Sequence, residues 1–325
     1  AGCRDAAGLL ALAREPGLLV HGLVVDGQVA TVREAVRAAG AETRVGAMAW
    51  QGGPLPYADG MVNLLVVDPE AALPEEEIKR VLAPFGVAYT RQNGTWAAYR
   101  QPWPEDFDEW SHSRYDATGN AVSRDRQVGP PRFLQWEAGP RWNRGVKTSS
   151  MVAQRGRIFF ILDDSLFAVA GRSWSLIARD AGNGLLLWRH ELPSWSGSRG
   201  GKKVGPAQTH RLLVAEGDRV YAPLADAAPV SQLDAGSGRV LRTYAETERA
   251  EEILVAGGVL VDLVNPNTPT GLRRGVEQDM FVLAFAPESG DLLWRHQARM
   301  ILPMTLAADD SQVVFHDGKD RKSVV

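Results

Sequence analysis

The chain has 325 residues, enough for two domains that each bury a core of their own. Its net charge is -3, so no basic field indicates binding to nucleic acid or to anionic lipid. The single cysteine, Cys3, excludes a disulfide within the chain and a zinc site built from cysteines alone. The longest apolar stretch, residues 18–25, is far shorter than the ~20 residues of a membrane-spanning helix.

Residues 1–100 alternate between helical and extended patterns. Apolar residues recur at three-to-four spacing in residues 5–15 and 28–39, which predicts two helices. Pro74 and the three Glu that follow it predict a third helix, because proline and acids both favour a first turn. Short apolar runs bounded by Gly, Pro or Asp predict strands at residues 18–25, 44–49, 62–67 and 86–90. This alternation predicts a parallel sheet with helices on its faces.

Residues 101–146 follow neither pattern, and we call them the connector. Five prolines interrupt regular elements there, while four tryptophans supply apolar anchors that a disordered linker would lack. We therefore expect an ordered but irregular segment that joins two domains. It carries a cluster of acids with one histidine: Asp106, Asp108, Glu109, His112 and Asp116. Their spacing matches no standard calcium loop, so we interpret the cluster as solvated turns and predict no metal site.

From residue 147 onward the chain is predicted to be all-β and repetitive. Residues 176–188, 230–242 and 282–294 share a strand–turn–strand pattern. Their turn glycines are Gly184, Gly238 and Gly290, spaced 54 and 52 residues apart. In two copies a tryptophan follows the glycine by four residues, at Trp188 and Trp294.

A second set of hairpins, at residues 156–160, 217–221, 257–261 and 310–315, interleaves with the first. Two hairpins per repeat predict four-stranded propeller blades, about three of them over residues 147–325. A sandwich or a barrel would not explain a repeat of this length. Three blades cannot close a ring, and the chain begins without Met, so we expect a fragment at both ends.

The repeats resemble those of the pyrroloquinoline-quinone-like (PQQ-like) propeller family, which carry Ala-x-Asp-x-x-x-Gly-x-x-x-Trp. Ala178, Asp180, Gly184 and Trp188 fit this pattern. In the second copy Asp234 lacks the preceding Ala, and in the third we interpret Pro287 as replacing the acid. Because many members of this family bind no quinone, the resemblance predicts the fold and not the cofactor. Many quinone dehydrogenases also use a disulfide between adjacent cysteines, which is impossible here.

Several polar residues of the repeats have simple structural interpretations. Asp180 and Asp234 stand at turn positions, where a carboxylate stabilises the turn. His190 and His296 each follow the repeat tryptophan position by two residues, so we predict that they are structural. Trp188 and Trp294 should be buried at matching positions of two blades.

The first hundred residues resemble class I S-adenosylmethionine-dependent methyltransferases, in residues 55–67 and 80–86. The first segment is similar to the family's "LPf-x-D-x-x-x-D-x-V" and the second to its "R-x-L-x-P-G-G". The resemblance implies a Rossmann-like sheet whose first strand lies in the middle. We therefore expect the strands at 18–25 and 62–67 to flank a short stub formed by residues 1–3. The fusion of both domains resembles large planctomycete-type bacterial proteins.

The same resemblance places a vestigial S-adenosylmethionine pocket at Gly2, Cys3, Asp5, Asp26, Trp50 and Gln51. Arg4 replaces a glycine of the family's turn and should project across the pocket. Val24 stands where the family has the acid that binds both ribose hydroxyls, and the nearest acid, Asp26, comes two residues after that position. Losing such contacts costs about 1–3 kcal/mol each, so we predict a degenerate domain.

We therefore predict a binding or scaffold protein with no catalytic residues, whose propeller binds a protein or a small molecule. S-adenosylmethionine remains a possible ligand, and pyrroloquinoline quinone is not expected. The first alternative is an active methyltransferase whose propeller selects the substrate, and the second is a quinoprotein oxidoreductase. Because propellers of this type are often found outside the cytoplasm, we expect an extracytoplasmic location, with a cytoplasmic one as the alternative.

Overall fold

The computed structural model describes residues 1–25, 27–92, 94–130, 133–138, 147–163, 174–193, 195, 209–267, 279–318 and 321–324. These residues form two compact units, which we describe separately. The first, the α/β unit, comprises Ala1–Glu105 with Phe133–Trp136, and the second, the β unit, comprises Asp106–Arg132 with Glu137–Val325. The connector is thus divided between the units.

The α/β unit contains three α-helices, one 3-10 helix and five strands among its described residues. They are α1 (Ala7–Leu12), β1 (Val20–Val24), α2 (Val29–Ala38), β2 (Val45–Ala49), β3 (Val62–Val67), η1 (Pro69–Ala71), α3 (Glu75–Val81), β4 (Leu82–Gln92) and β5 (Thr95–Arg100). Strand β1 pairs with β2 and β3 pairs with β4, both in parallel, while β5 is antiparallel to β4. Parallel strands connected by helices are what the alternating pattern predicted.

Residues 1–3 form the predicted stub between β1 and β3. Cys3 bridges Val24 in parallel, and its N–H donates to the Leu23 carbonyl at 2.8 Å. On the other side the Asp68 N–H, just after β3, donates to the Ala1 carbonyl at 2.9 Å. The strand order is therefore β2, β1, stub, β3, β4, β5.

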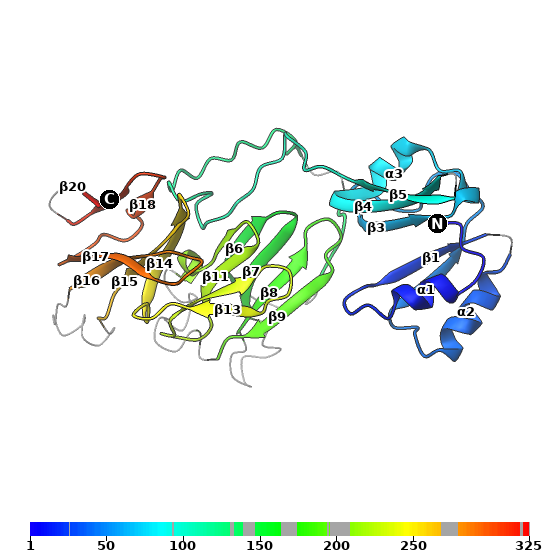
Figure 1. Ribbon diagram of the computed structural model, residues 1–325. Helices are drawn as coiled ribbons and strands as arrows, with labels where there is room; N and C mark the ends of the chain where they lie inside the picture. Colours follow the sequence, from blue (N-terminus) through cyan, green and yellow to red (C-terminus); the bar gives the residue numbers. More distant parts are fainter. Residues whose placement is uncertain are drawn as a thin grey trace. The chain divides into compact units, whose positions relative to one another are not determined.

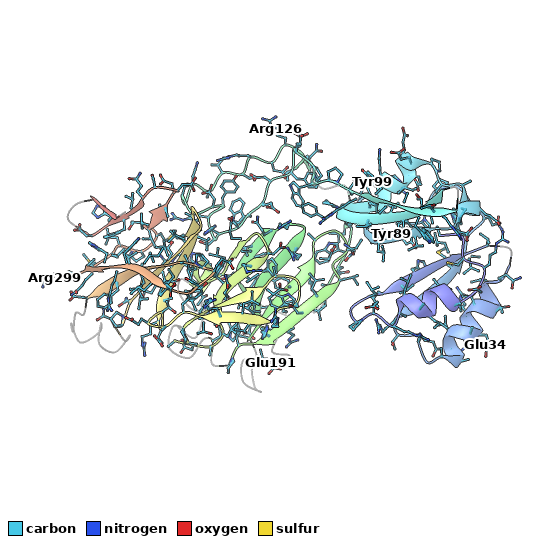
Figure 2. All side chains as sticks on the ribbon, in the orientation of Figure 1. Glu34, Tyr89, Tyr99, Arg126, Glu191 and Arg299 are labelled. Atoms are coloured by element: carbon cyan, nitrogen blue, oxygen red, sulfur yellow. The ribbon has the colours of Figure 1, made fainter. Side chains whose placement is uncertain are left out.

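Two apolar clusters hold the α/β unit together. One packs α1 and α2 on β1 and β2, with Leu9 and Val32 among its members. The other packs α3 on β3 and β4. Tyr89 and Tyr99, on neighbouring strands β4 and β5, belong to opposite faces of their sheet (Figure 2), because Tyr99 pairs with Ala88 and not with Tyr89. Tyr99 packs on the second cluster, whereas Tyr89 is exposed.

The β unit consists of antiparallel sheets that follow one another along the chain (Figure 1). Three of these sheets have four strands each. The first contains β6 (Lys147–Gln154), β7 (Arg157–Asp163), β8 (Trp174–Asp180) and β9 (Leu186–Glu191), and the second contains β10 (Val214–Glu216), β11 (Arg219–Pro223), β12 (Val230–Asp234) and β13 (Val240–Thr243). The third contains β14 (Ala250–Ala256), β15 (Val259–Val264), β16 (Met280–Phe285) and β17 (Leu292–Ala298). A further sheet contains β18 (Ala307–Ala308), β19 (Val313–His316) and β20 (Arg321–Val324), and η2 (Thr209–Leu212) precedes β10. These sheets are consistent with propeller blades, and we call them blades 1 to 4.

The first strands of the blades lie side by side, because β6 contacts β10, β10 contacts β14 and β14 contacts β18. Between the blades lies a continuous apolar core that includes Phe159, Leu233 and Leu283. A second cluster joins blades 3 and 4 and includes Val282 and Phe315. The repeated hairpins therefore bury their apolar faces against neighbouring hairpins, as the sequence pattern predicted.

The repeat register is confirmed by strand pairing. Trp188 pairs with Ala178 and Trp294 pairs with Ala284, and a bulge follows each pair. Arg242 occupies the same place in blade 2, opposite Gln232.

In the third repeat, however, the position equivalent to Asp180 lies one residue before Pro287, the residue assigned to it from the sequence. The Gly290 N–H donates to the Ala286 carbonyl, just as the Gly184 N–H donates to that of Asp180, so Ala286 and not Pro287 replaces the acid.

The residue at this register position covers the turn of the next blade. The Trp188 indole Nε1 donates to the Ala235 carbonyl at 2.9 Å and lies over Gly238, where a Cβ would come within 2.6 Å of the ring. Arg242 lies over Gly290 in the same way and donates from Nη2 to the Glu288 carbonyl at 2.6 Å.

The burial predicted for the two tryptophans holds for only one of them. Trp188 is 8% exposed, whereas Trp294 is only half-buried against the second cluster.

In the described ranges no helix is long and apolar enough to cross a membrane.

Candidate functional site

The predicted methyl-donor residues near the chain start are engaged in structural contacts. Gly2 has a φ of +86°, and a Cβ there would lie 2.9 Å from the Asp68 Cβ. Cys3 is half-buried in its bridge to β1. The Asp5 carboxylate accepts the Ala7 N–H at 2.9 Å, at the start of α1. Arg4 forms an exposed ion pair with Glu70 in η1.

The remaining residues of that prediction have different surroundings. Val24 is buried in the cluster between β1 and the helices. Trp50 belongs to the other apolar cluster, and Gln51 is exposed. Asp26 lies outside the described residues, so its position is not assigned.

In the β unit, residues 110–117 connect four blades, and we call them the bridging segment. Three of its carbonyls accept backbone N–H groups from the first strands. Trp110 accepts from Ala153 in β6 at 2.7 Å, Ser111 accepts from Ala215 in β10 at 3.0 Å, and Ala117 accepts from Ala308 in β18 at 2.9 Å. For β14 the acceptor is a side chain, because the Val255 N–H donates to His112 Nε2 at 3.0 Å.

These four donors occupy equivalent positions. In each blade the donor comes one residue before the residue at which the first strand ends its pairing with the second strand. These last paired residues are Gln154, Glu216, Ala256 and Asp309. The bridging segment therefore satisfies one N–H group in every blade, which a buried backbone requires.

The bond to Val255 fixes the protonation of His112. Since Nε2 accepts, the ring proton lies on Nδ1, which is 2.7 Å from the Ser111 hydroxyl. Ser111 in turn donates to the Tyr115 carbonyl at 3.3 Å. The imidazole is 3% exposed, and burial lowers the pKa of His112 to about 4, against a smaller opposing effect of Asp116. A neutral histidine with both nitrogens bonded is a structural group.

The acids of the predicted cluster bind backbone groups of different segments. Asp108 accepts the N–H of Arg124 and the Ser123 hydroxyl, and so it closes the loop that follows. Glu109 accepts the Arg155 N–H at the first hairpin turn of blade 1. Asp116 accepts the Thr118 N–H at 3.0 Å. In the described part of the chain no three His, Cys, Asp or Glu side chains gather closely enough to hold a metal ion.

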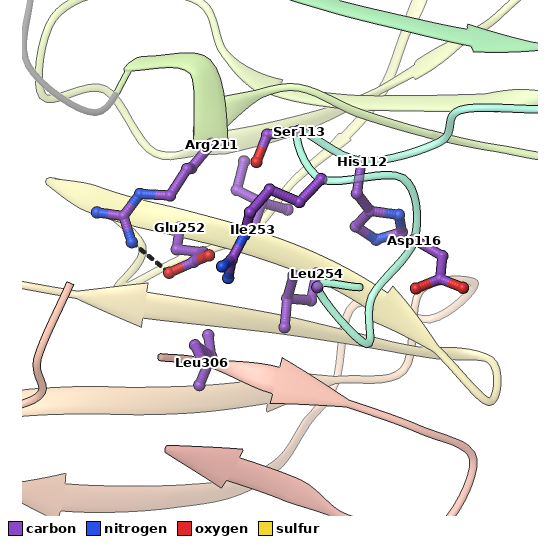
Figure 3. Close-up of a pocket in the computed structure, with 10 residues that line it drawn as sticks. His112, Ser113, Asp116, Arg211, Glu252, Ile253, Leu254 and Leu306 are labelled. Carbon is purple, nitrogen blue, oxygen red and sulfur yellow. Dashed lines mark hydrogen bonds and ion pairs between the residues drawn. The ribbon is translucent and has the colours of Figure 1, made fainter. Parts of the chain in front are cut away.

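A small polar pocket lies beside the bridging segment (Figure 3). It is lined by His112, Arg114 and Asp116 from that segment, Arg211 from η2, Glu252 from β14, and Leu306. It has room for about one water molecule.

Arg211 and Glu252 form a buried ion pair at this pocket. Their side chains are 1% and 4% exposed, and Nη1 of Arg211 bonds Oε2 of Glu252. Burial raises the pKa of Glu252, while the charges of Arg211 and Arg114 act in the opposite direction. Two further nitrogens of Arg211, Nε and Nη2, are buried without a partner in the described residues.

The sequence did not reveal this pair, because its members come from different repeats, 41 residues apart. The signal available was a charged residue beside an apolar run in each case, Arg211 before 212–215 and Glu252 before 253–256. Such a residue is usually exposed, so only the contact between blades identifies it.

No protein-family model matches the chain, and no curated protein matches its sequence. Among solved structures, the chain is similar to a europium-containing methanol dehydrogenase with a TM-score of 0.36 and 10% sequence identity. The match covers 60% of this chain and 34% of that enzyme. The chain therefore spans about a third of the length of that protein, and so low a score carries no conclusion about activity.

Proposed function

We propose that this chain is a binding or scaffold protein, in which a PQQ-like propeller that includes the β unit serves interaction. In this proposal the α/β unit is a methyltransferase-like domain that transfers no methyl group. The observation that carries it is that chemically capable side chains of the bridging segment serve the fold. His112 is the clearest case, since both of its ring nitrogens hold backbone or hydroxyl partners.

The α/β unit supports the same proposal. S-adenosylmethionine needs a carboxylate for the ribose hydroxyls and an open approach to the glycine turn. Here the corresponding residue, Val24, lies in an apolar cluster, and Asp5 is bonded to the start of α1. These contacts support a domain that does not bind the methyl donor.

Among the described residues of the β unit, the pocket beside Arg211 offers no support for a quinoprotein oxidoreductase. A tricyclic quinone requires far more space than the pocket at Arg211, which holds about one water molecule.

An active methyltransferase is the alternative that a specific observation favours. The order β2, β1, stub, β3, β4, β5 is that of a Rossmann-like sheet in which the central strand is short. Such a sheet would place a ligand at the carboxyl ends of its central strands.

Isothermal titration with S-adenosylmethionine separates the two functions. We expect no saturable heat, because Asp5 of the predicted pocket is bonded to the start of α1 and Val24 is buried in an apolar cluster. Binding with a stoichiometry of one would contradict the proposal. In that case Asp5→Asn and Arg91→Gln serve as a matched pair of variants. If S-adenosylmethionine occupies the predicted pocket, Asp5→Asn must lower its affinity, whereas Arg91→Gln, on β4, must leave the affinity unchanged.

A further inference from the structure

The outermost strand of the α/β sheet, β5, has an edge without a neighbouring strand. Among the described strands it pairs with β4 alone. Just after β5 the Gln101 N–H donates to the Gly86 carbonyl of β4 at 2.8 Å, and every second residue before Gln101 faces β4 in the same way. The residues between these, Trp96, Ala98 and Arg100, therefore direct their N–H and C=O groups away from the sheet. In the part of the chain that the structure describes, nothing bonds these backbone groups.

β5 lacks the features by which proteins usually protect such an edge, namely lysines, prolines, bulges or a covering segment. Its sequence is Thr-Trp-Ala-Ala-Tyr-Arg, and it pairs with β4 without a register shift. Ala97 and Ala98 are exposed, so no other described segment covers the middle of the strand. At the opposite edge of the sheet, by contrast, Arg33 of α2 donates to the Ala47 carbonyl of β2 at 2.9 Å. β5 is therefore the edge that can accept another strand.

Two copies of β5 match each other in antiparallel orientation. About a two-fold axis at Ala98, each Ala98 faces Ala98 of the second copy, and each Trp96 faces Arg100 of the second copy. All of these residues direct their backbone groups outward, so each pair can exchange two hydrogen bonds. Their side chains lie on one face of the sheet, because successive side chains of a strand alternate. The pairing therefore places a guanidinium beside an indole, a favourable cation–π contact, and keeps the two Arg100 charges about 13 Å apart along the strands.

We propose that the chain forms a homodimer in which β5 pairs antiparallel with β5 of a second copy, so that two α/β sheets become one continuous sheet. A second copy is favoured over an unrelated strand because β5 itself supplies both partners of each Trp96–Arg100 contact. Arg100 is already held over the Phe85 ring, 5.3 Å from its centroid, so this contact orders little more of its side chain. One strand of six residues buries less than the ~1,200 Å² of the smallest stable interfaces, so the dimer should be weak and concentration-dependent.

The first test is sedimentation velocity of the full chain between about 1 µM and about 500 µM, the range in which a weak dimer dissociates. We expect the mean mass to rise with concentration from that of one chain toward that of two. Ala98→Lys places two like charges directly opposite each other at the axis, so its dissociation constant should rise roughly fivefold or more. Tyr89→Lys is the matched control. It adds the same charge opposite Ala98, on the same face, but on β4, which already has neighbours on both sides, and it should leave the constant unchanged.

The second test measures the register by cross-linking. Ala98→Cys is made together with Cys3→Ser, which removes the single native cysteine. The two Cα atoms at position 98 would lie about 5.5 Å apart, within reach of a short bis-maleimide that joins two thiols. A covalent dimer should therefore form and be visible by denaturing electrophoresis. Thr95→Cys with Cys3→Ser is the control, because its two copies would lie about 20 Å apart along the strands and should not be joined. This test also decides the proposal if Ala98→Lys does not fold.

Three results would overturn the proposal. The first is a monomer at every concentration, which would leave β5 to a strand of another protein or to solvent. The second is a dimer that Ala98→Lys does not weaken, because its interface would then lie elsewhere. The third is cross-linking of the Thr95 variant as fast as that of the Ala98 variant, which would exclude the register. The inference goes beyond the proposed function, and none of these results bears on methyl-donor binding, so the two can fail separately.

Discussion

Asp262 is a carboxyl group buried inside a blade, with no partner for either oxygen among the described residues. It lies on β15 between Ile253 and Leu283 of the neighbouring strands, and burial raises its pKa well above the ordinary value. The folded chain therefore holds a proton here that the unfolded chain releases above its pKa of about 3.9. This contribution to stability is complete below that pH and is lost as the pH rises toward the folded pKa.

Asp262→Asn should therefore stabilise the β unit increasingly as the pH rises. Near pH 3 the carboxyl is neutral in both the folded and the unfolded state, so the variant and the wild type should differ least in unfolding temperature there. As the pH rises further, the unfolding temperature of the variant should exceed that of the wild type by a growing margin until the pH reaches the folded pKa, as measured by differential scanning calorimetry. The control is Asp309→Asn, at an exposed turn where backbone bonds lower the pKa of Asp309. If Asp262→Asn gave a difference independent of pH, the carboxyl would not be held neutral.

At the level of single residues, the sequence allowed prediction where a side chain acts locally. Asp180 and Asp234 accept N–H groups two or three residues ahead, at Gly182 and Ser237, and this is the turn role predicted for them. Arg211, Glu252 and Asp262 were not predicted, because their roles depend on which blade packs beside them.

At the level of elements, the contacts of the bridging segment hold residues 110–117 of the connector in place. Its bonds to Ala153, Ala215, Val255 and Ala308 tie together strands that are far apart in the sequence. The sequence predicted order there from its tryptophans, and Trp110 does form a bridge to Ala153. It could not predict the partners, since three of the four acceptors are backbone carbonyls that any residue carries.

These four amide groups should exchange hydrogen slowly and together. Each is bonded to the bridging segment, so exchange requires that this segment separate from the blades. Native-state hydrogen exchange read by NMR should give all four a similar, high protection. The Gly258 amide, in an exposed turn, should exchange rapidly.

His112→Ala tests the assignment of these bonds. It removes the acceptor of Val255 alone, so the protection of the Val255 amide should fall while that of Ala153 changes little. Rapid exchange at all four positions in the wild type would contradict the role given to the bridging segment.

Helix and strand positions were largely predictable, and the differences have local causes. The strand expected at 62–67 is β3 (Val62–Val67). The helix expected to begin at Pro74 is α3, which ends at Val81 because the residue before Pro84 avoids helical geometry and Leu82 already begins β4. The helix expected over 5–15 is shorter, Ala7–Leu12, and begins at the bond from the Ala7 N–H to Asp5.

At the level of the whole molecule, the two units have separate hydrophobic cores. The clusters around Leu9 and Leu65 lie within the α/β unit, and those around Phe159 and Val282 lie within the β unit. A unit with its own core can unfold cooperatively by itself. We therefore expect calorimetry to resolve two transitions, and a substitution in one core to move only one of them.

Gly238→Ala is the substitution that tests this expectation most directly. Gly238 has a φ of +71°, and an added Cβ would come within 2.6 Å of the Trp188 ring. Left-handed backbone and overpacking together should cost about 2–4 kcal/mol, which lowers the β-unit transition by roughly 4–16 °C.

Gly217→Ala is the matched control, because its φ is +58° and nothing lies within 4 Å of the added Cβ. Without overpacking it should cost about 1 kcal/mol. The backbone strain is common to both variants, so the difference between their losses of unfolding free energy measures the packing of Trp188 on the next blade. The α/β transition should stay in place in both variants. A single transition that moves as a whole would instead mean that the two cores unfold as one cooperative body.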